Sequence, residues 1–272
     1  MTDIISNGQV NSPSDGVRQG LYATSTVQNG SLGAKREMAD GRVFRYGYAV
    51  SAVGAGQLAA LDASVAVQTS FNAAFTNSAG TAADYTSGQT TLYVKTGDIT
   101  TADAADVFAG GYLHITDEGG EGYTYRLRGN GVGSATATNV MRLDLYDPTQ
   151  TALDSEDSVS ITGSMYNNLA IYNNGTDDVT VGVPLVDVPA TSYAWFQTWG
   201  PATVLADESA GTIAAGTIAQ GSDGVNGAAQ PFGGGATNSE DDHSYATEPI
   251  IGFFMTAAVD TEYVATMLQI AP

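Results

Sequence analysis

The side chains that most often perform catalysis are scarce in this chain, and their spacing does not form a site. It has two histidines, His114 and His243, and no cysteine. His114 falls in the β-rich run GYLHIT and His243 in the acidic stretch NSEDDHS, so we interpret each as a satisfied or solvated side chain. No G-x-S-x-G nucleophile motif is present. Nucleophilic hydrolysis, thiol catalysis and cysteine-ligated zinc therefore have no support in the sequence.

Carboxylates are the abundant chemical group, with 29 Asp and Glu residues. A glycosidase needs two carboxyls at a fixed separation across a cleft, and positions on β loops do not set that distance. Oxygen ligands for calcium cluster in DSEDS, residues 154–158, and in SEDDH, residues 239–243, but neither stretch matches an EF-hand loop. We interpret both as solvated acidic loops and expect no metal and no cofactor.

The glycine-rich stretch GNGVGS, residues 129–134, has the composition of a phosphate-binding loop. Such loops hold an anion at the N-terminus of a helix. Here the following residues, ATATNVMRLDLY, predict another strand, so we expect a hairpin tip.

The charge of the chain limits its partners. Nine Lys and Arg residues against 29 Asp and Glu give a formal net charge of −20. A field of this sign repels nucleic-acid phosphates and anionic membranes, so we expect neither as a partner. The N-terminus lacks the pattern of a signal peptide, and no apolar run reaches the ~20 residues of a membrane span.

Residues 1–42 are predicted to form an extended N-terminal arm, because Asn, Ser, Gly, Pro and Asp dominate its start and no sustained apolar period follows. Most of the basic residues lie in it or directly after it. Two interpretations stay open: ordinary solvated charges, or an arm that docks on an acidic neighbour. The basic residues concerned are Arg18, Lys35, Arg36, Arg42 and Arg45.

From Val43 onward the pattern predicts an all-β protein. The stretch VFRYGYAV alternates with a period of two, and short β-rich runs separated by turn residues follow it through the middle of the chain. This is typical of antiparallel sheets joined by hairpins. Helix remains an alternative for residues 57–71, which are rich in alanine and leucine.

Both tryptophans lie in TSYAWFQTWG, residues 191–200. In a strand Trp195 and Trp199 point to one side and Phe196 to the other, so we expect a strand that is buried on both faces. Proline cannot donate to a sheet ladder, so Gly200-Pro201 is predicted to end it. A core or a subunit contact explains these aromatic side chains better than a carbohydrate platform does.

The closing third of the chain, with TSYAWFQTWGPATVL, AGTIAAGTIAQG and EPIIGFFMTAAVDTEYVATMLQI, resembles the decoration or cement proteins of tailed-bacteriophage heads. LGAKREMADGRVFRYGYAVSAVGAGQLAA and EGYTYRLRGNGVGSATATNVMRLDLYD also resemble virion proteins of such phages. The resemblance implies a β-sandwich or β-tulip-like body on the outer capsid surface, made in the host cytoplasm, with the major capsid protein and further copies, often three, as partners. It implies no catalytic residue.

Head-stabilising proteins of this kind are shorter than this chain, so we expect an added central subdomain. The predicted division is an arm at 1–42, a body at 43–83 and 188–272, and an inserted β subdomain at 84–187. Capsid or subunit contacts are predicted at Arg18, Lys35, Arg36, Arg42, Arg45, Trp195 and Trp199. The alternative function is that of a receptor- or glycan-binding protein associated with a tail or fibre; a secreted glycan-active enzyme has less support.

Overall fold

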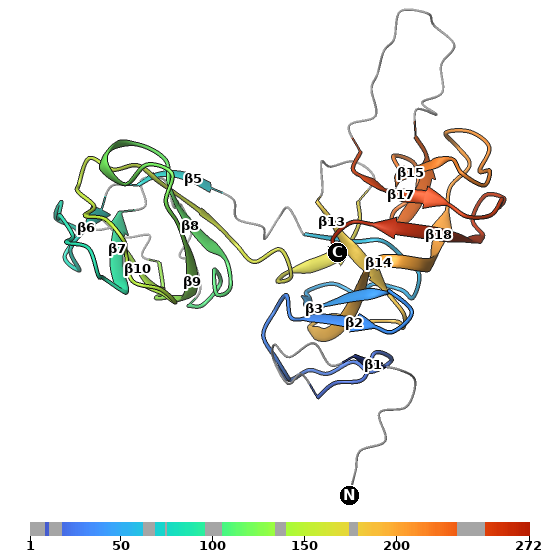
Figure 1. Ribbon diagram of the computed structural model, residues 1–272, viewed down its shortest axis with the longest axis horizontal. Helices are drawn as coiled ribbons and strands as arrows, with labels where there is room; N and C mark the ends of the chain where they lie inside the picture. Colours follow the sequence, from blue (N-terminus) through green and yellow to red (C-terminus); the bar gives the residue numbers. More distant parts are fainter. Residues whose placement is uncertain are drawn as a thin grey trace, which may run out of the picture. The chain divides into compact units, whose positions relative to one another are not determined.

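The computed structural model describes residues 9–10, 18–61, 69–73, 75–95, 105–133, 140–173, 179–232 and 248–272, with the backbone alone at 9–10 and 69–73. These residues form strands and one short 3₁₀ helix, Glu118–Gly120. The predicted all-β fold class is confirmed (Figure 1). The chain divides into two compact units: Met1–Ala66 with Met165–Pro272, here called the body, and Val67–Ser164, here called the inserted unit.

The inserted unit begins and ends about twenty residues earlier than the sequence suggested. Strands β12 (Leu169–Ile171) and β13 (Thr180–Pro184), expected in the insertion, pair with β4 (Ala59–Leu61) of the body. Conversely, β6 (Phe75–Thr76), expected in the body, pairs with β7 (Thr91–Lys95) of the inserted unit. The boundaries therefore follow hydrogen bonding between distant segments, which local composition does not report.

The arm also ends earlier than predicted. Residues 35–38 form β2 (Lys35–Met38), which pairs antiparallel with β3 (Val43–Ala49). Ser25 exchanges two backbone hydrogen bonds with Tyr193, with N–O distances of 3.1 and 2.7 Å. Residues 18–42 thus belong to the body, because their backbone groups find partners there.

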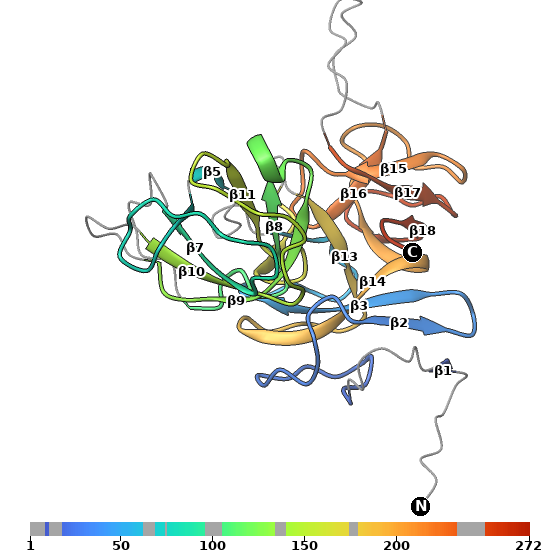
Figure 2. The same ribbon diagram turned by 60° about the vertical axis from the view of Figure 1, so that its left-hand side comes forward.

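The strands of the body form two closed rings that share one strand (Figures 1 and 2). The first ring runs β3, β12, β4, β13, β14 and back to β3; the second runs β14, β16, β15, β17, β18 and back to β14. Two of these pairings, β12 with β3 and β14 with β16, are parallel, and the others are antiparallel. The remaining strands of the body are β1 (Gln9–Val10), β14 (Ser192–Ala206), β15 (Ile218–Gly221), β16 (Ala228–Pro231), β17 (Ile250–Phe254) and β18 (Tyr263–Gln269).

Each ring has its own core. Every strand of the first ring contributes to one cluster of buried side chains that includes Leu169, Val181 and Phe196. Every strand of the second ring contributes to another, which includes Phe254 and Leu268. Since strand side chains alternate between two faces, closing a sheet in this way places one face of every strand inside a core.

Strand β14, with 15 residues, is the shared strand. Its first half pairs with β3 and β13, and its second half with β18 and β16. A bulge between Gln197 and Trp199 separates the halves. The buried Gln197 amide donates from Nε2 to the carbonyls of Trp199 (3.1 Å) and Pro201 (2.8 Å), which satisfies backbone groups at this irregular point.

The prediction that Gly200-Pro201 ends this strand is wrong. β14 continues to Ala206 and pairs with β18 through Pro201 itself. Among the described strands β18 is the only neighbour at Pro201, because pairing with β3 ends at Trp199 and pairing with β16 starts at Leu205. A proline is tolerated where one side of a strand has no ladder to complete. The prediction of a strand buried on both faces is confirmed over residues 194–198.

The inserted unit is one seven-stranded sheet in the order β5-β11-β8-β9-β10-β7-β6, with every pairing antiparallel. A single cluster of buried side chains, among them Phe75, Leu113 and Leu143, forms its core. The described part of the glycine-rich stretch, residues 129–133, starts within β9, and β10 pairs antiparallel with β9 as expected of a hairpin. Its remaining strands are β5 (Thr69–Ala73), β8 (Tyr112–Ile115), β9 (Thr124–Asn130), β10 (Val140–Leu145) and β11 (Val159–Thr162).

The helix considered for residues 57–71 is not formed where the chain is described. Residues 59–61 are strand β4 and residues 69–73 are strand β5. Pairing with neighbouring strands outweighs the intrinsic helix preference of alanine and leucine here.

Candidate assembly surface

His114 is a satisfied surface histidine, as predicted. Its ring in β8 lies between two hydroxyls, with Nδ1 3.2 Å from Thr124 Oγ1 and Nε2 3.0 Å from Thr162 Oγ1. His243 lies outside the described residues. Over the part of the chain that the structure describes, no group of three or more His, Asp and Glu side chains is arranged to hold a metal ion.

The acidic stretch 154–158 was predicted to be solvated, and for Asp157 this is wrong. Asp157 is 1% exposed. Its Oδ2 accepts from the Asp154 N–H (2.8 Å) and its Oδ1 from the Gly120 N–H (3.3 Å). The Asp157 carboxylate therefore joins two loops of the inserted unit through hydrogen bonds to their backbone N–H groups. The second acidic stretch, 239–243, lies outside the described residues.

The structure brings the predicted basic contact residues together on β2, β3 and the turn between them, with Arg18 preceding them in the chain. Lys35 pairs with Glu37 (3.7 Å), and Arg42 Nε lies 2.8 Å from Asp40 Oδ2. Arg45 donates to the carbonyls of Gly33 (3.2 Å) and Pro272 (3.0 Å). These three side chains therefore have partners within the body.

Arg36 also has its partners within the body, where it stacks on the aromatic strand β14. Its guanidinium lies 4.1 Å from the centre of the Trp195 ring and donates to the Gln19 carbonyl at 2.8 Å. Burial lowers the pKa of Arg36 below its ordinary value. Stacking on an aromatic face satisfies a guanidinium without removing its charge. Arg18, in contrast, is exposed.

Gln19 fastens the segment that follows the arm to the aromatic strand. The Trp195 indole N–H donates to its carbonyl (2.9 Å), the Tyr46 hydroxyl donates to its Oε1 (2.8 Å), and its Nε2 donates to the Tyr193 carbonyl (2.8 Å). Trp195 is 2% exposed. The predicted contact residue Trp195 is therefore an internal anchor of the body, while Trp199 stays half-buried.

The outer face of the second ring exposes large apolar side chains, which the sequence analysis missed. Ile218 of β15, Phe253 of β17, Met267 of β18 and Pro201 of β14 are successive cross-strand partners. Cross-strand partners point to the same face of a sheet. Met267 is half-buried and the other three are exposed, so this row, here called the apolar row, faces solvent across four strands.

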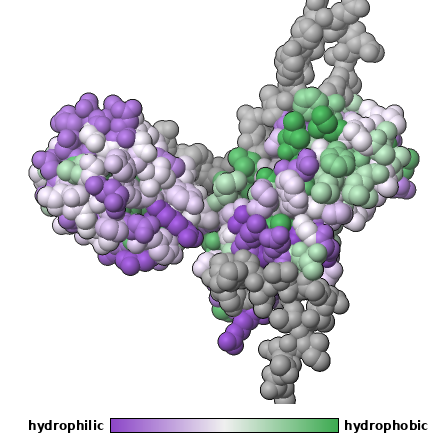
Figure 3. Space-filling model, viewed as in Figure 1, coloured by the Kyte–Doolittle hydropathy of each residue, from purple (hydrophilic) through white to green (hydrophobic). Residues whose placement is uncertain are grey.

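Further apolar side chains extend the apolar row along the same strands. Met255 is 43% exposed and its N–H donates to the Ala265 carbonyl, next to Met267 along β18. Tyr263 at the start of β18 is 52% exposed. In Figure 3, hydrophobic residues gather over the part of the body that contains β15, β17 and β18. A contiguous exposed apolar patch on a sheet face is typical of an interaction surface.

One glycine explains why the stretch IIGFF, residues 250–254, did not reveal this face. Gly252 has a φ of +144°, and a Cβ there would lie 1.9 Å from the Met267 carbonyl oxygen. At Gly252 the pairing of β17 with β15 is irregular. As a result Ile251 and Phe254 point into the core, while Ile250 and Phe253 point outward. Simple alternation cannot give this result.

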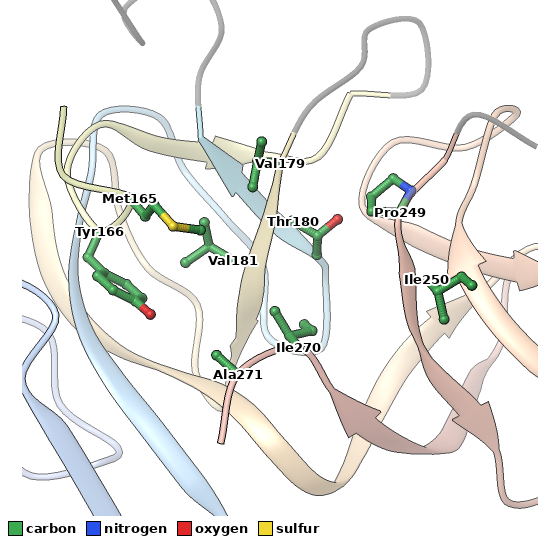
Figure 4. A pocket seen from close by; sticks show the side chains of 9 residues that line it. All are labelled: Met165, Tyr166, Val179, Thr180, Val181, Pro249, Ile250, Ile270 and Ala271. Carbon is green, nitrogen blue, oxygen red and sulfur yellow. The ribbon is translucent and has the colours of Figure 1, made fainter. Parts of the chain in front are cut away.

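A small hollow in the body lies between the residues around β13 and the C-terminus (Figure 4). It measures about 230 Å³, below the ~300–1,000 Å³ typical of ligand sites. Its lining is mostly apolar and includes Thr180, whose buried hydroxyl has no hydrogen-bond partner among the described residues.

No helix long and apolar enough to cross a membrane occurs in the described ranges. Comparison of the chain with protein-family models, with curated proteins and with solved structures gave no match. Within the described residues, the apolar row is the feature most typical of a surface that binds a partner.

Proposed function

We propose that this chain is a structural protein of a tailed-bacteriophage virion, which attaches to the outer surface of the capsid and stabilises it as a decoration protein. Its partners are the major capsid protein and further copies of itself, with a trimer as the expected assembly. The observation that supports an assembly role is the apolar row on the second ring, since soluble proteins rarely leave such a face without a partner.

The charge of the chain suits this role. A net charge of −20 keeps separate copies soluble before assembly. Once many copies bind a lattice, each bound state is stabilised by mass action, and contacts between neighbours add avidity. The specific assignment to a phage capsid depends on the sequence resemblance described above.

The test is the number of copies in purified particles of the source virus, measured by quantitative mass spectrometry against the main shell protein. A copy number of the same order as that of the shell subunit is the expected result. A handful of copies would move the protein to a tail or fibre, and none at all would overturn the virion assignment.

A second candidate function, glycan binding, is favoured by one row on the inserted unit. Thr162, Tyr112 and Arg126 are neighbours across three strands. Tyr146, directly after β10, donates its N–H to the Arg126 carbonyl, and the Arg126 guanidinium lies 4.9 Å from the centre of the Tyr146 ring. Tyr112 is 44% and Tyr146 52% exposed. Exposed aromatic faces with hydroxyls and a planar donor beside them suit sugars.

Binding of the full chain to a glycan array distinguishes the two functions. Glycan binding that Tyr146→Ala abolishes and Tyr123→Ala leaves intact would support the glycan-binding function. Tyr123 is the matched control, because it is exposed to a similar degree (43%) and its ring stacks on Tyr125 outside this row.

A further inference from the structure

We infer that the apolar row of one copy binds a second copy of this chain, and that residues 18–28 of the second copy form the contacting surface. This inference rests on the self-assembly in the proposed function and deepens it, because it names the two surfaces that join copies; the contact itself does not require a capsid. Exposure, rigidity and charge of the two surfaces support it.

The segment 18–28 exposes its apolar side chains to an unusual degree. Tyr22 is 71% exposed and Val27 67% exposed, and these are the two most exposed large apolar side chains in the described residues. Arg18 is also exposed. A tyrosine flanked by a cation is a typical anchor of a protein interface.

The segment is held rigidly. Leu21 is buried beside Trp195, and the Gln19 amide donates to the Ala23 carbonyl at 2.7 Å across the turn that contains Tyr22. The Ser25 hydroxyl both donates to the Val27 carbonyl (2.8 Å) and accepts from the Val27 N–H (3.0 Å). A preorganised surface loses little conformational entropy on binding, which favours its use as a contact.

The charges of the two surfaces are complementary. Within residues 18–28 the exposed Arg18 is the only charged side chain, whereas no Lys or Arg occurs anywhere after Arg142. The loop between β17 and β18 beside the apolar row adds the exposed carboxylates of Asp260 and Glu262. An apolar face with an acidic rim therefore meets an apolar segment that carries one exposed cation, which favours encounter and orientation.

The same charges disfavour the symmetric alternative. If two copies joined apolar row to apolar row, each acidic rim would meet the same surface of the other copy, where Arg42 beside Gly200 is already paired with Asp40, at a cost in like-charge repulsion. Joining segment 18–28 of one copy to the apolar row of the next is a head-to-tail contact, and each copy then gives one surface and receives one. Such contacts close into rings when their rotation permits.

The experiment uses the purified full chain and measures its mass in solution by sedimentation velocity over a range of concentrations. We expect the wild type to associate, and Tyr22→Ser and Phe253→Ser each to weaken association at least about tenfold, the effect of losing one interface anchor. Val132→Ser is the matched control, because Val132 is 63% exposed on the inserted unit and lies on neither surface. Unchanged thermal melts establish that the variants are folded.

Mixing the two defective variants tests the direction of the contact. A Tyr22→Ser copy keeps an intact apolar row and a Phe253→Ser copy keeps an intact segment, so their mixture should form a dimer and stop there. Wild type that stays monomeric at its highest soluble concentration would overturn the inference. Tyr22→Ser that associates like wild type would also do so and would indicate a symmetric row-to-row contact. Association in solution combined with absence from virions would overturn only the proposed function.

Discussion

The outer faces of the two units are built from the same kind of strand and differ in chemistry. Across β14, β15, β17 and β18 the outward residues form the apolar row, while across β8, β9 and β11 of the inserted unit they include a tyrosine, a histidine, threonines and arginines. The inward residues of both units are mostly apolar and form the cores. The outer rows contribute less to these cores, so their chemistry is free to serve recognition.

The largest effect is expected from shortening the body at its N-terminus. Deleting residues 1–42 removes β2 and Gln19, which leaves the Trp195 indole and the edge of β3 without partners, so we expect the body not to fold. Deleting residues 1–17 leaves all of these contacts in place. Circular dichroism of both truncated chains makes the comparison, and equal folding of the two would contradict the placement of residues 18–42 in the body.

Removing an inner aromatic side chain should cost about 3–5 kcal/mol of the free energy of unfolding. The variant is Trp195→Ala, which also loses the stacking of Arg36 and the hydrogen bond to Gln19. Trp199→Ala is the control on the same strand and should cost less, because Trp199 is half-buried. Urea unfolding gives both values, and similar losses for the two variants would place Trp195 outside the core.

A change at the bulge that turns Phe253 outward should cost at least about 2 kcal/mol, from backbone strain and a direct clash. The variant is Gly252→Ala, whose Cβ would meet the Met267 carbonyl. Gly20→Ala is the control, since nothing lies within 4 Å of a Cβ there. A melt of Gly252→Ala that matches wild type would mean that the outer row does not depend on this bulge.

The second ring should also respond to acid through Asp207. Burial alone would raise the pKa of Asp207, but hydrogen bonds from the Ser222 hydroxyl and from Ser209 outweigh it and hold the pKa below its ordinary value. A depressed pKa in the folded state contributes stability above the unfolded pKa of about 3.9, and this contribution is lost as the pH falls through the folded value.

Thermal melts of wild type and Asp207→Asn, taken from neutral pH down to about pH 2, test this linkage. Wild type should be the more stable at neutral pH, and the gap between the two should narrow below about pH 4. A gap that stays constant across the range would show that the carboxylate charge of Asp207 contributes nothing to stability.

The smallest effects on stability are expected on the two outer faces themselves. Phe253→Ser and Tyr112→Ser should each change the free energy of unfolding by no more than about 1 kcal/mol, as is usual for exposed positions. They should differ in association, which only Phe253→Ser weakens. Equal effects of the two variants on association would remove the distinction between the faces.

The features of the fold that depend on residue alternation and on turn residues could be predicted from the sequence. The strand at Val43–Ala49, the burial of residues 194–198 on both faces and the all-β class are confirmed by the structure. Ring closure could not be predicted, because it depends on pairings such as that of Ala49 with Leu169, which lie far apart in the chain. Two of the strand pairings in the rings are also parallel, and turn residues that predict hairpins indicate only antiparallel pairing.

The candidate site was harder to predict than the fold, for two physical reasons. The basic residues and Trp195 stood out by residue type, but cations and indoles are readily satisfied within a chain, as the stacked pair of Arg36 and Trp195 shows. The apolar row was hidden because IIGFF reads as uniformly buried until Gly252 breaks its alternation. The missed signal was a glycine inside an apolar run, which often marks a bulge.

Strand β14 has a mechanical consequence for the assembly inferred above. Trp195, which anchors the segment offered to one neighbour, and Pro201, which belongs to the face offered to the other, lie on the same strand. Tension between neighbouring copies would therefore pass through each body along a few residues of covalent backbone. An assembly joined in this way would carry that tension in the covalent backbone of β14, and the hydrogen bonds to the strands beside β14 would be loaded in shear.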